Sequence, residues 1–427
     1  MKNLKKLLAL ALVLLMVVSM VACGAKKEES KEIVINFPCI WVGTDAKAPY
    51  MAQLVEQFNA ENAGSIKVVI EEQTDYQAYR DKIRTLITTG NAPDIFSVDN
   101  PQELANFSAT GKLMDFTSAL EGDWKANFND GCIDPYIYEN GQINFLPFES
   151  AVIPLVYNTE LLAEVGYETF PATYDEMMAM FAALKDAGYN ACGQMAAENA
   201  WTSMLWYSQL VASIGGPDVY KNGLEDPAFV QAAEVLREMY NYTFDGAISA
   251  AAADVNGHFI ARDTAVYING CWWIGNFYKE ENAVDGKLLA DVINVTGAPT
   301  WEGGKGEGAV LAQAQAFLCA AKQDDPAKEA AIIKFLQYIT DPTRISEWEA
   351  SAGSMFFIKH EPAADLKEIS KAFGAVSNEA AFTIYTFAQS VPLAVSNEFP
   401  AAVSALANDV VDAQGFVDML IAARDNA

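Results

Sequence analysis

Early in the chain, short apolar runs alternate with longer segments in which apolar side chains recur every three or four positions. The short runs are rich in β-branched and aromatic residues and predict strands at 32–37, 66–70 and 94–98. The longer segments each carry one apolar stripe and predict helices at 49–62 and 76–89. This alternation predicts an α/β fold with a parallel sheet and helices on both faces. Ligands bind beyond the carboxyl ends of strands in such sheets, so 38–48 and 99–101 are the first segments to search.

Later helices are predicted from the residues that begin them. An Asp before a Pro can accept a hydrogen bond from a first-turn amide, while the Pro takes a position where no N–H is needed. Three such pairs occur: Asp226-Pro227, Asp325-Pro326 and Asp341-Pro342. Thr173 and Glu176 have the spacing of a capping box. The methionine-rich stripe that follows is assigned to the core, namely Met177, Met180, Phe181 and Leu184.

The N-terminus has the pattern of a secretory signal. Three lysines precede an apolar run over 7–18, which is shorter than the roughly 20 residues that span a bilayer. The run stops at Ala22 and Cys23, which resembles the bacterial lipobox. This resemblance implies a signal peptide over 1–22, diacylglycerol on Cys23, and a polar tether over 23–31. The chain would then be anchored at the outer face of the cytoplasmic membrane. An ordinary signal peptide with a chance cysteine is the alternative.

Composition narrows the classes of function. The chain has 427 residues, 52% of them hydrophobic, which predicts two or three domains, or one large α/β unit, with a sizeable core. A net charge of −28 argues against nucleic acid, which needs a basic face. The two histidines, His258 and His360, lack the spacing of metal ligands, and the five cysteines after Cys23 show no CxxC pair. We therefore expect no metal, no cofactor and mostly buried thiols.

Several segments in the middle of the chain, taken together, resemble one family. Gly90 to Asp94 resembles the Gly-x-x-Pro-Asp motif that precedes the family's third strand. The other matching segments are 155–162, 165–176, 259–272 and 339–353. In this order they are similar to the family 1 extracellular solute-binding proteins of ABC importers, in the carbohydrate-binding group related to maltodextrin-binding protein. Two departures are Tyr174 in place of the usual Trp, and Arg262 in place of Gly, which suggests a different turn.

The resemblance implies a two-lobe fold like that of periplasmic binding proteins, each lobe a mostly parallel sheet flanked by helices. Lobe one would comprise 32–148 and 299–351, and lobe two 149–298 and 352–427. The chain would cross near Phe148, return near Ala298 and cross again near Gly353. Ligand binding would close the hinge between the lobes. The implied partners are a carbohydrate ligand and the permease subunits of the importer, with the receptor itself a monomer.

Sugars present flat C–H faces and a rim of hydroxyl groups, so aromatic platforms ringed by carboxylates and amides suit them. Position and resemblance together indicate the ligand contacts Trp41, Asp45, Asp99, Asn100, Glu149, Trp201, Trp272, Trp273 and Met355. Each has a structural alternative. Trp41 could simply pack, Asp99 could cap a helix, and Glu149 could be a solvated hinge charge. Trp273 belongs to the core if Trp272 faces the ligand, because neighbours in an extended segment point opposite ways.

Three functions remain open at this point. The first is a lipid-anchored receptor that binds a sugar or oligosaccharide, with no enzymatic activity. The second is a receptor for a cationic solute such as a polyamine or betaine, held by aromatic rings and carboxylates. The third is a secreted glycoside hydrolase, which needs two suitably spaced carboxylates.

Overall fold

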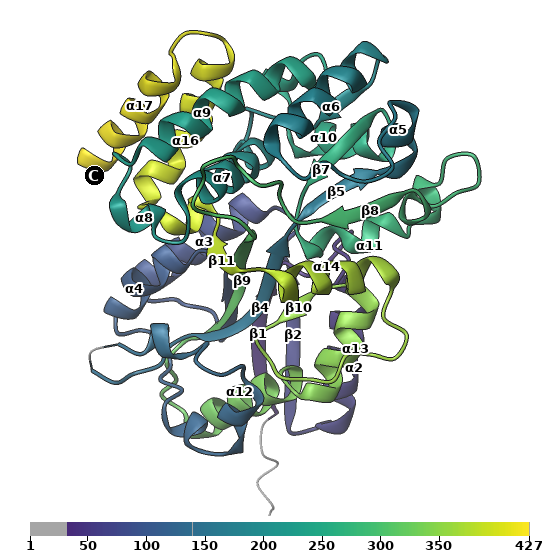
Figure 1. The fold of residues 1–427 in the computed structure, drawn as a ribbon. Coiled ribbons are helices and arrows are strands. Elements are labelled where there is room, and N and C mark those ends of the chain that lie inside the picture. Colours follow the sequence, from purple (N-terminus) through teal and green to yellow (C-terminus); the bar gives the residue numbers. More distant parts are fainter. Residues whose placement is uncertain (1–31, 139, 427) are drawn as a thin grey trace, which may run out of the picture.

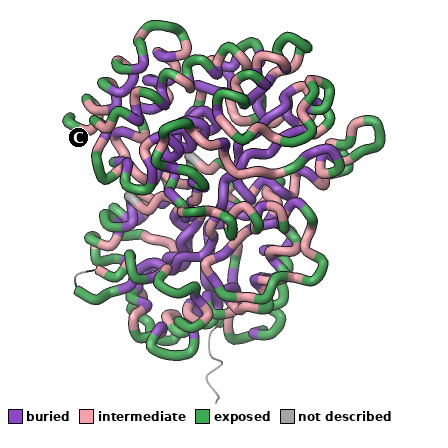
Figure 2. Tube along the Cα trace, viewed as in Figure 1, coloured by how far each residue is buried: buried purple, intermediate pink, exposed green. Residues whose placement is uncertain are grey.

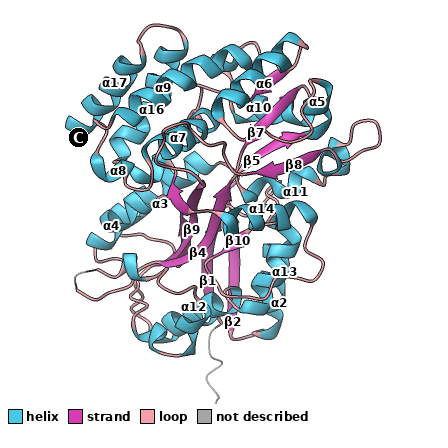
Figure 3. Cartoon of the chain, viewed as in Figure 1, coloured by secondary structure: helices cyan, strands magenta, loops and turns pink. Residues whose placement is uncertain are grey.

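The computed structural model describes residues 32–138 and 140–426. The predicted signal peptide over 1–22 and the whole tether over 23–31, Cys23 included, lie outside these residues. Figure 1 shows two lobes joined by two long strands, β4 (Leu146–Ile153) and β9 (Ala309–Ala320). Helices surround the strands of both lobes, so the expected two-lobe α/β architecture is confirmed (Figure 3).

Lobe one is built on the predicted alternation of strands and helices. Its first elements are β1 (Ile33–Cys39), α2 (Ala48–Glu61), β2 (Ile66–Glu72), α3 (Tyr76–Thr88), β3 (Ile95–Val98) and α4 (Pro101–Ala109). Strands β1 and β2 pair in parallel, from Ile33 opposite Ile66 to Cys39 opposite Glu72. Strand β3 pairs antiparallel with β9, so the lobe mixes both strand directions. Two later helices complete this lobe, α12 (Pro326–Ile339) and α13 (Pro342–Ala352).

Lobe two contains a four-stranded sheet in the order β6-β7-β5-β8. Its strands are β5 (Leu155–Asn158), β6 (Asn190–Cys192), β7 (Thr264–Ile268) and β8 (Ile293–Thr296). The helices between them are α5 (Thr159–Glu164), α6 (Tyr174–Asp186), α7 (Trp201–Gly215), α8 (Val219–Asn222), α9 (Pro227–Met239), α10 (Ala252–Ile260) and α11 (Ile274–Phe277). The C-terminal segment adds α14 (Glu368–Glu379), β11 (Phe382–Tyr385), α15 (Phe387–Ser390), α16 (Leu393–Ala407) and α17 (Ala413–Asp425).

The predicted helix starts form as the capping rules require. The side chains of Asp226, Asp325 and Asp341 each accept a hydrogen bond from an amide of the first turn of α9, α12 and α13. Thr173 and Glu176 form the complete capping box at the start of α6. Because these bonds satisfy amides that the helix itself leaves unpaired, they can be read directly from local sequence.

The crossings between the lobes meet in one sheet. Strand β4 runs antiparallel to β9, from Leu146 opposite Leu318 to Ile153 opposite Leu311, with register shifts on both sides of Glu149. The start of β9 pairs with β11 and its end with β3, so this strand belongs to both lobes. The short strand β10 (Met355–Phe356) pairs with β4 at Ser150 and Glu149.

The second crossing differs from the position expected near Ala298. Trp301 packs against the hydrophobic cluster of lobe two, and Ala309 and Leu311 are members of that cluster. Ala314 and Ala316 belong to the cluster of lobe one. Strand β9 runs without a break from one cluster to the other. The chain therefore changes lobes within β9, near Gln313.

Buried residues lie along the inner segments of both lobes (Figure 2), and their side chains form three clusters. One fills lobe one, and two fill lobe two. The assigned methionine stripe lies in the core, since Met177, Met180, Phe181 and Leu184 are all buried. Cys39, Cys192, Cys271 and Cys319 are buried free thiols and Cys132 is partly exposed, as the scattered cysteines predict.

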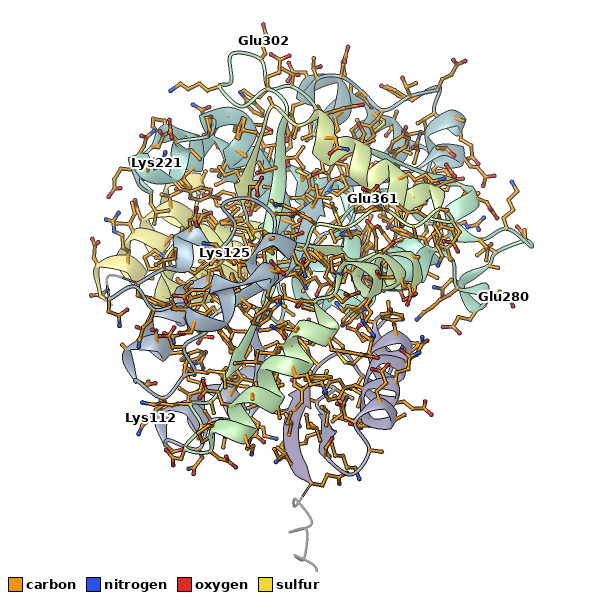
Figure 4. All side chains as sticks on the ribbon, turned by 90° about the horizontal axis from the view of Figure 1, so that it is seen from below. Lys112, Lys125, Lys221, Glu280, Glu302 and Glu361 are labelled. Atoms are coloured by element: carbon orange, nitrogen blue, oxygen red, sulfur yellow. The ribbon has the colours of Figure 1, made fainter. Side chains whose placement is uncertain are left out.

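Charged side chains lie mainly on the outside. Figure 4 labels six that project outward, Lys112, Lys125, Lys221, Glu280, Glu302 and Glu361. Within the residues that the structure describes, no helix is long and apolar enough to cross a membrane. The same residues contain no group of three or more His, Cys, Asp or Glu side chains placed to hold a metal ion.

The turn at Arg262 is held in a conformation that glycine favours. A different turn was expected because the family pattern has Gly there, yet Arg262 has a φ of 62°, in the left-handed region. Its Nη2 donates hydrogen bonds to the carbonyl oxygens of Lys287, at 2.6 Å, and Leu288, at 3.2 Å. These bonds offset part of the cost of the left-handed backbone.

Candidate ligand-binding site

Two tryptophans form a partly exposed aromatic pair in lobe two. Trp201 is the first residue of α7, and Trp272 lies in the 3-10 helix Cys271–Trp273 that follows β7. Their ring centroids are 6.0 Å apart and their planes make an angle of 50°. Both rings touch the two clusters of lobe two without being enclosed by them. Exposed aromatic surface of this kind suits the apolar face of a sugar ring.

The backbone before Trp201 is strained. Glu198 has a φ of 54° and Ala200 a φ of 50°, in the left-handed region that disfavours residues other than glycine. Ala200 provides no side-chain cap for α7. Strain of this kind persists only where the surroundings fix the chain, and it gathers at functional sites. Trp201 is therefore held at a fixed point at the start of a buried helix.

A buried ion pair joins lobe one to the first crossing strand. Lys47, just before α2, donates hydrogen bonds from Nζ to both carboxylate oxygens of Glu149, at 3.1 and 3.3 Å. The residues are only 3% and 1% exposed. Burial lowers the pKa of Lys47, but the carboxylates of Glu149 and Asp45 outweigh burial and raise it. Burial also raises the pKa of Glu149, against the opposing effect of Lys47.

The segment that carries Trp272 contacts the crossing strand next to Glu149. Cys271, the neighbour of Trp272, contacts the carbonyl oxygen of Ser150 through Sγ, at 3.8 Å. Burial, and after it the Glu149 carboxylate, raise the pKa of Cys271 to about 12. Met355 pairs with Ser150 across β10 and β4 and is partly exposed. The backbone segments that carry Glu149, Met355 and Trp272 therefore lie next to one another where the lobes meet.

Two further carboxylates belong to lobe one. Asp45 accepts hydrogen bonds from the Lys47 amide, at 2.8 Å, and from the Tyr76 hydroxyl, at 3.3 Å. Asp99, directly after β3, accepts hydrogen bonds from Nε of Arg80 at 3.0 and 3.1 Å. Each acid predicted from the sequence thus has a basic or hydroxyl partner nearby, which fixes its orientation and neutralises part of its charge.

The two lobes also touch directly. The side-chain amide of Gln389, in α15 of lobe two, donates hydrogen bonds to the carbonyl oxygens of Asp99, at 3.2 Å, and Ala314, at 2.8 Å. A Cβ added to Gly275 in α11 would lie 3.0 Å from Cβ of Ala46 in lobe one. The loops that carry Asp45 and Asp99 are therefore both in contact with lobe two.

Two predicted contacts lie in hydrophobic cores instead. Trp41 is 1% exposed, and its ring lies 5.4 Å from that of Phe148 and 5.6 Å from that of Trp348. Trp273 is 8% exposed and packs on Tyr267 and Phe277. Neither ring presents a face to a ligand in this conformation, because neighbouring aromatic side chains cover it.

Two surface pockets of lobe two do not coincide with these residues. A pocket of about 630 Å³ lies among the ends of α6, α9 and α16, and one of about 420 Å³ lies between α9 and α17. Neither is lined by any predicted ligand contact. Both belong to lobe two alone, and neither is lined by a tryptophan. The aromatic and charged residues where the lobes meet remain the better candidate.

Comparison with known proteins agrees with this architecture. Residues 43–343 match the family described as bacterial extracellular solute-binding protein. The chain belongs to this family. The matched region contains the loops of Asp45 and Asp99, both long strands and the Trp201–Trp272 pair.

Several relatives of this family member are sugar-binding proteins by description. The diacetylchitobiose binding protein DasA of Streptomyces coelicolor is 26% identical over 349 residues, which cover 76% of each chain. A solved chitin oligosaccharide binding protein has a TM-score of 0.82 at 18% identity, covering 93% of this chain and 99% of that one. A raffinose complex of SBP RafE has a TM-score of 0.72 at 20% identity, covering 92% and 99%. At these identities the two structures show the shared fold.

Sequence reasoning did not single out several residues of this solute-binding protein. Lys47, Tyr76 and Arg80 hold the predicted carboxylates, and Gln389 joins the lobes. Lys47 lies between the first predicted strand and helix, in the segment 38–48 where ligand contacts were expected. Its position could therefore have marked it as a candidate. Nothing in the local sequence of Gln389 indicates its contact with Asp99, since 290 positions separate them.

Proposed function

We propose that this protein is the solute receptor of an ABC importer and binds a neutral sugar or oligosaccharide between its lobes. The observation that carries the proposal is the partly exposed pair of Trp201 and Trp272, whose ring centroids are 6.0 Å apart, with Trp272 next to a residue that contacts the first crossing strand. Indole faces bind the apolar C–H face of a sugar ring, and polar groups at the rim bind its hydroxyl groups. The sugar-binding relatives support the same ligand class.

In this proposal lobe one supplies the polar rim. Asp45, Asp99 and Asn100 face the ligand from the loops after β1 and β3. Lys47 and Glu149 are buried and hold the hinge side of the site in place. Met355 adds an adaptable apolar contact at the third crossing. Trp41 and Trp273 support these residues from the cores. Closure of the lobes would be driven by the ligand, because it contacts both lobes only in the closed state.

The pairing of the acidic residues favours a neutral ligand over a cationic one. Glu149 is neutralised by Lys47, and Asp99 by Arg80. A polyamine or betaine would have to compete with these fixed cations. We also propose that the protein is not an enzyme, since its relatives are binding proteins. A glycoside hydrolase would release products from an oligosaccharide, whereas a receptor returns it unchanged.

A thermal-shift screen of residues 24–427 tests the ligand class. The panel comprises diacetylchitobiose, xylo- and malto-oligosaccharides, raffinose, galactose, spermidine and glycine betaine. A ligand at 100 times its Kd adds about 2.7 kcal/mol to the free energy of unfolding and raises Tm visibly. A shift with saccharides alone is expected. A shift with spermidine or betaine alone would overturn the sugar proposal, and released products after long incubation would overturn the receptor proposal.

We further propose that the mature chain begins at Cys23 and is tethered by lipid to the outer face of the cytoplasmic membrane, where it delivers its ligand to the permease as a monomer. Labelling of cells with radioactive palmitate tests the anchor. The wild-type protein should carry label in the membrane fraction, and the Cys23→Ser variant should carry none. Label retained on Cys23→Ser would contradict the proposal.

A further inference from the structure

Gly270 occupies a position that no larger residue fits while the Trp272 ring stays in place, although its backbone is ordinary. Its φ of −92° and ψ of 173° are extended values that any residue adopts. A Cβ added there would nevertheless lie closer than 3.0 Å to Cε3, Cζ3 and Cη2 of Trp272. Real Cβ atoms do not approach other atoms so closely. The requirement for glycine therefore comes from the indole ring and not from the backbone.

These three atoms belong to the six-membered ring of the indole. That ring lies directly over the backbone of Gly270, and its position sets the 6.0 Å separation and the 50° angle to Trp201. Hydrogen bonds hold the chain beneath the ring. The Gly270 amide donates to Oδ1 of Asn269, at 2.9 Å, and the buried Asn269 side chain also contacts the Tyr267 hydroxyl.

The fixed backbone decides how an added methyl group would be accommodated. Asn269 and Tyr267 are both buried, at 7% and 1% exposure, so the chain at residue 270 has little room to retreat. Trp272 is only partly buried and can move outward. A side chain at residue 270 would therefore displace the indole ring, and with it the geometry of the aromatic pair.

We propose that Gly270 is a positioning residue of the ligand site, and that its missing side chain sets where Trp272 presents its ring beside Trp201. This inference rests on the proposed sugar-binding function. It extends that function by naming what places the sugar-stacking surface. Gly270 itself touches no ligand; it acts only through Trp272.

The variant Gly270→Ala tests this, with Gly297→Ala as the matched control. Gly297 lies in a loop of the same lobe, and a Cβ added there meets nothing within 4 Å. Without ligand, the near-ultraviolet circular dichroism of the indole groups should change in Gly270→Ala and not in Gly297→Ala. The Kd for diacetylchitobiose, or for the panel saccharide with the largest thermal shift, should rise about tenfold in Gly270→Ala alone.

A double variant separates positioning from general damage. Phenylalanine lacks the second ring, so Trp272→Phe removes the atoms that a Cβ at residue 270 would strike. Adding Gly270→Ala to Trp272→Phe should change Kd less than twofold. An equal loss of affinity in both backgrounds would overturn the proposal, as would an unchanged spectrum of Gly270→Ala. Should that variant fail to fold alone, folding of the double variant would lead to the same conclusion.

The two proposals can fail separately. If the wild-type protein binds no saccharide of the panel, the sugar-binding proposal fails, and the spectrum of Gly270→Ala alone decides whether Gly270 positions the ring. If the wild-type protein binds sugar and Gly270→Ala binds it equally well, only the positioning role is wrong.

Discussion

Lys47 Nζ donates hydrogen bonds to both carboxylate oxygens of Glu149, and this bidentate pair is buried where lobe one meets the first crossing strand. The register of β4 against β9 shifts on both sides of Glu149, so the pair is placed at an irregular point of the hinge sheet. Such bulges redirect a side chain out of the regular ladder. The hinge strand and the loop that follows β1 are thereby linked by one polar contact.

Removal of Lys47 should destabilise the protein strongly. In Lys47→Met the Glu149 carboxylate is left buried without its cation, which costs about 3–5 kcal/mol of the free energy of unfolding. Urea denaturation monitored by circular dichroism measures this loss. The double variant Lys47→Met/Glu149→Gln removes both charges and should recover most of it. A double variant as unstable as the single one would show that the loss comes from Lys47 contacts other than the ion pair.

Trp41 and Trp272 should show opposite effects on stability and binding. Trp41→Ala opens a cavity among Phe148, Trp348 and Phe37 and should lower the free energy of unfolding by about 3–5 kcal/mol. The milder Trp41→Phe should leave the Kd for the bound saccharide within twofold. Trp272→Ala should raise that Kd at least about tenfold with a smaller loss of stability. Calorimetric titration and thermal unfolding measure the two quantities. A large rise of Kd in Trp41→Phe would show that Trp41 contacts the ligand.

The Arg80–Asp99 pair should affect binding through orientation. Arg80 holds Asp99 with hydrogen bonds from Nε at 3.0 and 3.1 Å, while Gln389 contacts the Asp99 carbonyl oxygen. Asp99→Asn should raise the Kd for saccharide about tenfold, since a hydrogen bond to a charged group contributes about 1.5 kcal/mol or more. Arg80→Met should give a smaller rise, because Asp99 keeps its charge and loses only its fixed orientation. Equal affinities in all three proteins would exclude Asp99 as a ligand contact.

His360 should make stability depend on pH. Its Nε2 lies 3.1 Å from Glu349, and Nδ1 lies 2.8 Å from the Ile358 carbonyl oxygen. The hydrogen bond to Glu349, outweighing burial, raises the pKa of His360 above the usual 6.5, with Glu361 contributing in the same direction. Folding therefore favours the protonated form. The stabilisation is complete below about pH 6.5 and is lost as pH rises through the raised value.

The variant His360→Asn isolates this effect. Between pH 6 and pH 9 the free energy of unfolding of the wild type should fall by about 1 kcal/mol more than that of His360→Asn. This is the magnitude of a charge-assisted hydrogen bond at a partly exposed site. Urea denaturation at each pH gives the difference. Glu349→Gln should behave like His360→Asn. If the difference in free energy of unfolding between the two proteins stays constant from pH 6 to pH 9, the folded state does not favour the protonated form of His360.

Local sequence determined the elements and their ends. Strands β1 to β3, helices α2 and α3, the Asp-Pro helix starts and the capping box at Thr173 all depend on side chains within a few residues of the backbone that they shape. The order of these elements, with the motifs from Gly90 to Gly353, also indicated the family and its two lobes. These features can be predicted from the sequence because periodicity and capping depend only on residues close together along the chain.

Tertiary structure decided the roles of the site residues. Lys47 reaches Glu149 across 102 positions, and Gln389 reaches Asp99 across 290, so no local pattern foretold which charges would be paired. Trp41 and Trp272 both follow strands near the junction of the lobes, yet one is enclosed by aromatic side chains and the other is partly exposed. Gly270 has an ordinary extended backbone, and only the ring of Trp272 above it explains the glycine. Burial and close approach depend on which distant surfaces meet, and that is settled only when both lobes have folded.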